Sequence, residues 1–122
     1  MKPLVISPTQ HRAFAAAAEA AFLDRLTVQL TQDQLVSTRR LSRGQLRLRV
    51  AEAVQTGRGL GLVWASSLAA FATLSVVFGP DFHRHTQIRR VLEERDDTPD
   101  HRFLRLSTAV SDRAWREAAN AS

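Results

Sequence analysis

The sequence predicts a single all-α domain over residues 1–122, a bundle of about five helices around a central apolar helix. Apolar side chains recur at spacings of three and four residues, as they do on one face of a helix. No stretch shows the sustained alternation of apolar and polar residues that marks a strand. Residues 59–80 contain no charged side chain, although 24% of the 122 residues are charged. Such a run is typical of a helix that is buried on nearly all sides.

The uncharged stretch has a second interpretation, because its length approaches the ~20 apolar residues of a membrane span. Four hydroxyl side chains lie within it, and arginines flank it on both sides. These features favour a buried helix over residues 62–78, which Gly79-Pro80 would end because proline cannot continue the hydrogen-bond ladder. The sequence leaves open whether residues 60–79 are bundle core, a partner interface or a membrane-inserting segment.

Caps and apolar periodicity predict the other helices. Ser7 can cap a helix whose first position is Pro8, and Thr98 does the same before Pro99. The helices are expected from Pro8 to between Leu30 and Leu35, from Gln45 to Arg58, from Thr86 to Arg95, and from Pro99 to Ala118. The apolar stripe expected in the first helix is Phe14, Ala18, Phe22, Leu26 and Leu30, with Leu23 beside them. In the last helix Phe103, Leu106, Val110 and Ala114 should be buried, with Leu104 and Trp115 on an adjoining line.

Connections and tails are predicted from weaker signals. Residues 31–43 have little periodicity, and residues 1–6 and 119–122 are expected to be flexible tails. Glycines at 57, 59 and 61 should stop the second helix, because glycine tolerates the left-handed conformation that follows a helix end. Leu62 can then supply the apolar contact of a Schellman motif, and Ser66 is the best available cap for the central helix.

Composition bounds the class of protein. The chain has no cysteine, which excludes disulfides, thiolate metal sites and cysteine nucleophiles, and fits a reducing cytoplasm. The first ten residues lack the apolar region of a signal peptide, so we expect a cytoplasmic protein. Residues 1–80 carry nine basic and four acidic side chains, so the net charge of +5 originates there.

The excess of positive charge is local. It comes from arginines between positions 39 and 49. Most of these arginines lie off the helix face that Leu46 and Val50 need for the core, so they are free to contact carboxylates of a protein partner. Binding of nucleic acid is the alternative, since a basic helical surface can also contact phosphates. The candidate partner-binding residues are Arg39, Arg40, Arg43, Arg47 and Arg49, together with Trp64.

No motif predicts a catalyst. Asp81, His83 and His85 resemble metal ligands, but a zinc site needs three or four converging ligands, and a polar loop is the favoured interpretation. The acidic residues of 96–100 suit a helix N-terminus, where they complement the helix dipole. Nucleophile elbows, phosphate-binding loops and dinucleotide fingerprints are absent from the sequence. We therefore predict no enzymatic activity, no cofactor and no metal.

Three segments carry a family resemblance. They are Phe22-Leu23-Asp24-Arg25-Leu26, Gly61-Leu62, and Phe78-Gly79-Pro80-Asp81-Phe82. With Leu30, Val50 and Val54 between them, they resemble small, poorly characterised proteins encoded in bacterial type VI secretion clusters, beside spike proteins and effector adaptors. The pattern of that group is a Phe-x-Asp-Arg-(Met/Leu) helix, a Tyr-Gly-Ile turn and a helix ending in Phe-Gly-x-Asp-Phe. The resemblance covers residues 14–82 and fades after Phe82.

The resemblance implies a function. It suggests a non-enzymatic accessory protein of type VI secretion that binds an effector, a spike or an adaptor as a chaperone or co-adaptor. An immunity protein that neutralises a cognate toxin is the alternative within the same setting. The central helix of relatives carries several charges, whereas this one carries none, which suggests that this copy buries a surface that relatives expose. The sequence does not identify the partner or the oligomeric state.

Overall fold

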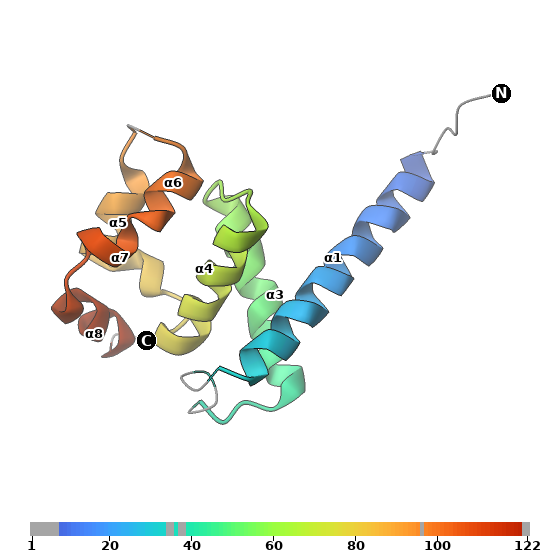
Figure 1. The fold of residues 1–122 in the computed structure, drawn as a ribbon, viewed down its shortest axis with the longest axis horizontal. Helices are drawn as coiled ribbons and strands as arrows, with labels where there is room; N and C mark the ends of the chain where they lie inside the picture. Colours follow the sequence, from blue (N-terminus) through green and yellow to red (C-terminus); the bar gives the residue numbers. More distant parts are fainter. Residues whose placement is uncertain (1–7, 34–35, 37–38, 96, 121–122) are drawn as a thin grey trace.

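The computed structural model describes residues 8–33, 36, 39–95 and 97–120, and it confirms the all-α class (Figure 1). Within these ranges the regular elements are all helical, and no strand is present. The helices are α1 (Pro8–Thr31), α3 (Arg43–Gly59), α4 (Ala65–Phe78), the short 3₁₀ helix η1 (Phe82–Arg84), α5 (Thr86–Glu93), α6 (Pro99–Leu104), α7 (Leu106–Ala109) and α8 (Asp112–Asn120).

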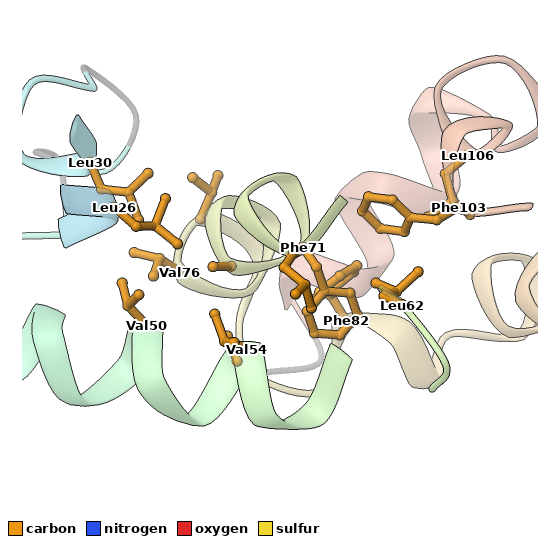
Figure 2. Packing of buried hydrophobic residues seen from close by; sticks show 14 of the residues in the cluster. Leu26, Leu30, Val50, Val54, Leu62, Phe71, Val76, Phe82, Phe103 and Leu106 are labelled. Atoms are coloured by element: carbon orange, nitrogen blue, oxygen red, sulfur yellow. The ribbon is translucent and has the colours of Figure 1, made fainter. Parts of the chain in front are cut away.

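The uncharged stretch forms α4, which is the central helix. It contacts α3, α6, α8 and η1. The Phe71 ring is completely buried, with its centroid 5.0 Å from that of Phe82 and 5.9 Å from that of Phe103 (Figure 2). On the α3 side Val76 packs near Val50 and Val54. The predicted bundle around a central apolar helix is thus present. The apolar side chains of α4 lie on several sides of the helix and pack on each of these neighbours.

α3 starts and ends on local signals. The Ser42 hydroxyl accepts a hydrogen bond from the Gln45 amide and the Gln45 side chain accepts one from the Ser42 amide, which is a capping box. At the other end the Leu62 amide donates to the Gly57 carbonyl at 3.0 Å, completing the predicted Schellman motif. Gly61 has φ +94°, and a β-carbon there would lie 2.9 Å from the Pro99 ring. Glycine is required at this turn both for its backbone and for its small size.

The first half of α1 projects away from the rest of the chain (Figure 1). The predicted stripe is correct for Leu26 and Leu30, which are buried, but wrong for Phe14 and Ala18, which are exposed. The physical reason is geometric. The first half of α1 projects beyond the other described helices (Figure 1), so the side chains of residues 12–18 are all exposed, whichever side of the helix they occupy. The predicted stripe is therefore correct in the second half of α1, where Leu23, Leu26 and Leu30 are buried and the helix packs on α3.

The single C-terminal helix predicted over 99–118 is three helices in the structure. Phe103, Leu106, Val110 and Ala114 are buried, as expected. The chain is extended at Val110, however, and the Ser111 hydroxyl accepts from the Ala114 amide, so a new helix begins there. A serine that bonds to backbone amides competes with helix continuation. The predicted tail at 1–6 lies outside the described residues, and α8 extends through Asn120.

The described helices include none with the length and apolar character that crossing a bilayer requires. α4 runs for only 14 residues, whereas a span needs about 20.

Candidate functional site

Four of the predicted partner-binding arginines are exposed, and two of them, Arg39 and Arg49, border the same hollow. We define the arginine patch as Arg39, Arg40, Arg43 and Arg49, all of which have exposed side chains. In the part of the chain that the structure describes, none of them lies within 4.0 Å of a carboxylate oxygen. Arg40 has φ +52°, and the capping box of α3 fixes the position at which Arg43 opens the helix. Unpaired guanidinium groups at the surface are available to a partner.

Arg47 differs from its predicted role. Its Nε donates to Asp24 Oδ1 at 2.8 Å, so it joins α3 to α1 and does not belong to the free surface. A second ion pair also joins α3 to α1. Arg58 donates two hydrogen bonds of 2.6 Å to the Glu19 carboxylate. Sequence analysis missed both pairs, because their partners lie 23 and 39 residues apart in the chain.

A small hollow connects the arginine patch to the end of α4. It has a volume of about 260 Å³, and its lining includes Arg39, Arg49, Phe78 and the Gly79-Pro80 turn. Gly79 has φ +104°, which lets the chain leave α4 sharply enough to form this wall. Pro80 also borders a neighbouring hollow that contains Arg49 and the carboxyl groups of Glu52 and Asp81. The cationic side chains therefore border concave surface as well as open solvent.

An apolar groove of about 870 Å³ lies on the other side of Phe78. α4 supplies Leu74 and Phe78, the α6–α7 segment supplies Leu104, and α8 supplies Trp115. The Phe78 and Trp115 rings lie 5.1 Å apart. The groove was not predicted as a site. The sequence contained one signal of it. Leu104 and Trp115 were expected on a helix face next to the buried face of the C-terminal segment.

Trp64 and most of the residues that carry the family resemblance contact other parts of the fold. Trp64 is 42% exposed, and its ring packs edge-on against His101 at 4.9 Å. Phe82 is completely buried, whereas Phe22 and Phe78 are half-buried. Asp81 lies 3.6 Å from Arg84, and Arg25 is exposed. Most of the residues that carry the family resemblance therefore maintain the fold.

The two histidines of the loop point to different partners. The His83 ring lies 5.6 Å from Phe71, and burial together with the charge of Arg84 lowers its pKa. His85 Nε2 lies 3.0 Å from Glu117, and this hydrogen bond is the largest cause that lowers the pKa of Glu117. Among the residues that the structure describes, no three His, Asp or Glu side chains converge on a point where a metal ion could be held.

Asp100 is a buried carboxylate with a structural task. Its oxygens accept hydrogen bonds from the Val63 amide at 3.2 Å and the Trp64 amide at 2.9 Å, just before α4 begins. It replaces the predicted cap Ser66, because α4 has no side-chain cap of its own. Burial acts to raise the pKa of Asp100, but the hydrogen bonds from Trp64 and Val63 and the nearby Ser67 hydroxyl outweigh it and lower that pKa.

No protein-family model, curated protein sequence or solved structure matches the chain.

Proposed function

We propose that the chain is a non-enzymatic accessory protein of a bacterial type VI secretion system that acts in the cytoplasm. In this proposal it binds an effector, spike or adaptor protein as a chaperone or co-adaptor. The proposal rests on the family resemblance of residues 14–82, and the arginine patch is the observation that supports a protein-binding role. Exposed guanidinium groups with no carboxylate oxygen within 4.0 Å in the described chain are suited to carboxylates on a partner, which they contact in a bidentate manner.

The partner is sought first among proteins encoded by neighbouring genes, by affinity capture with the purified chain. The charge-reversal variant Arg43→Glu/Arg49→Glu should then weaken the captured complex by about tenfold or more, mainly through slower association at low salt. Arg49 is chosen in preference to Arg47, because changing Arg47 would break its contact with Asp24 and perturb the packing of α1 on α3. The affinity is measured by isothermal titration calorimetry at two salt concentrations.

A matched control separates the patch from net charge. Arg12→Glu/Arg90→Glu makes the same change of charge at two exposed positions on α1 and α5, away from the patch. It should leave the affinity within about twofold, and both variants should retain the helical circular dichroism of the wild type. An equal loss in the two variants, or no loss in either, would contradict a role for the arginine patch.

Two further assays distinguish the alternative functions. If the captured partner is a toxin, co-expression that restores growth assigns an immunity role, whereas a chaperone has no such requirement. Binding of random duplex DNA is measured as a function of salt. We expect only feeble binding at physiological salt, and tight binding that falls linearly with the logarithm of salt concentration would replace the protein-partner proposal. Absence of a partner among the neighbouring gene products would count against both secretion roles.

A further inference from the structure

The apolar groove offers a docking surface of a definite shape. It runs between α4 on one side and α6, α7 and α8 on the other. Leu74, Phe78 and Trp115 are half-buried, and Leu104 is 55% exposed, so large apolar side chains border solvent along one continuous depression. An exposed apolar surface that gathers in a groove indicates a binding site more strongly than scattered surface leucines do.

Positive charge borders this groove at two places. Phe78 lines both the groove and the small hollow that contains Arg39 and Arg49, so the two depressions have this residue in common. Arg116 of α8 lies in the groove wall, and its exposed side chain has no carboxylate within 4.0 Å in the described ranges. Asp112, one turn earlier on α8, is the acidic residue of the lining. The groove lining itself therefore carries one cation and one anion. Arg39 and Arg49 add two cations next to Phe78, and Glu52 and Asp81 lie in a further hollow that Arg49 also borders.

We propose that the groove binds an amphipathic helix of the protein partner, with large apolar residues on one face and acidic residues flanking them. This inference rests on the proposed function only for the claim that the partner is a protein. Helices bind in such grooves through apolar anchors at positions i, i+3 or i+4, and i+7. The flanking acids of the ligand would meet Arg39 and Arg49 at one end and Arg116 along the wall, and this charge complementarity sets the specificity.

A second copy of this chain is a poorer occupant. Among the residues that the structure describes, the first half of α1 exposes apolar side chains that a second copy could offer, and Phe14 there is 75% exposed. That segment has no acidic residue between Pro8 and Ala18 and carries Arg12. It therefore lacks the negative charge that the surroundings of the groove require.

The test uses a designed probe and the whole chain. The probe is a fluorescein-labelled peptide of about 18 residues, or five helical turns, with leucine on one face and glutamate flanking it. A second peptide keeps the leucines and replaces each glutamate by lysine. Fluorescence anisotropy should show binding of the acidic peptide, with the lysine peptide binding at least about tenfold more weakly.

The variant Leu104→Glu places a negative charge inside the groove at a position exposed enough to leave the fold intact. This variant should bind the acidic peptide with an affinity lower by about tenfold or more. Leu48→Glu is the matched control, because Leu48 is 61% exposed on α3 and does not line the groove. This control should change the affinity by no more than about twofold.

Several outcomes would overturn the inference. They are equal affinity for both peptides, no binding of the acidic peptide, or insensitivity to Leu104→Glu. Cosedimentation with vesicles of equimolar phosphatidylcholine and phosphatidylglycerol, lost in Leu104→Glu while the peptide fails to bind, would assign the groove to a membrane surface. If Arg43→Glu/Arg49→Glu weakens a natural partner but the peptide does not bind, the groove inference fails and the proposed function stands. If the peptide binds but no secretion partner exists, the groove inference stands and the proposed function fails.

Discussion

Replacing Phe71 by alanine is expected to destabilise the folded chain by about 3–5 kcal/mol, the largest effect of any single truncation proposed for this protein. The Phe71 ring is completely buried and contacts the rings of Phe82 and Phe103, so it joins the central helix to η1 and α6. Alanine would leave a cavity where three elements meet. Their backbones cannot all move inward to fill it, because each is held by other contacts.

The free energy of unfolding is measured by urea denaturation followed by circular dichroism. Leu74→Ala is an informative comparison, because Leu74 also belongs to α4 but lines the groove and is only half-buried. Its loss should be clearly smaller, about 1–2 kcal/mol. If Phe71→Ala cost as little as Leu74→Ala, the central position of α4 in the core would be wrong.

Replacing Asp100 by alanine is expected to cost about 1.5–3 kcal/mol, since hydrogen bonds to a charged acceptor contribute in that range. The Val63 and Trp64 amides would lose their acceptor at the start of α4, which has no side-chain cap of its own. Asp100→Asn keeps one acceptor oxygen but not the charge, so its loss should be intermediate. If the Asp100 carboxylate interacted only with the dipole at the N-terminus of α6, the loss of stability would be much smaller.

The same residue makes stability depend on pH. The pKa of Asp100 is lower in the folded chain than the usual value of about 4 for an unfolded aspartate. Its ionisation therefore contributes full stability above about pH 4, and the contribution is lost as the pH falls through the folded-state pKa. Between about pH 5 and pH 2 the wild type should lose more stability than Asp100→Asn.

Urea denaturation of both proteins at several pH values tests this expectation, and the difference between the two curves removes the effect of the other carboxylates. Glu117, whose pKa is also lowered by its hydrogen bond to His85, is present in both proteins and cancels. Parallel curves would show that the Asp100 carboxylate does not stabilise the fold through its charge.

The start of α3 was expected at Gln45 but lies at Arg43, because Ser42 was not recognised as a helix cap in the sequence. The end of α3 was predicted well, because the Schellman motif at Gly61 joins residues within five positions of one another. The same holds for the end of α4 at Gly79-Pro80. Predictions that extended a pattern over a longer distance were weaker. The stripe through Phe14 is wrong, and the C-terminal helix is interrupted at Val110 and Ser111.

The candidate site was only partly accessible to sequence reasoning. The run of arginines identified a basic surface, because charge excess can be counted along the chain. The removal of Arg47 from that surface depends on Asp24, which lies 23 residues away. The groove depends on α4, α6 and α8 coming together, and periodicity described each of those segments only by its own buried face.

The sequence by itself predicted that this chain is all-α, favoured an apolar central helix over residues 62–78, and located the cluster of arginines before and within α3. Each of these follows from periodicity, composition or a local cap. Only the tertiary structure decided which arginines are free, which carboxylate caps α4, and where apolar surface remains uncovered. Asp100 lies 36 residues from Trp64, and Leu104 lies 26 from Phe78. Such partners are chosen by the packing of whole helices, which no spacing within one segment encodes.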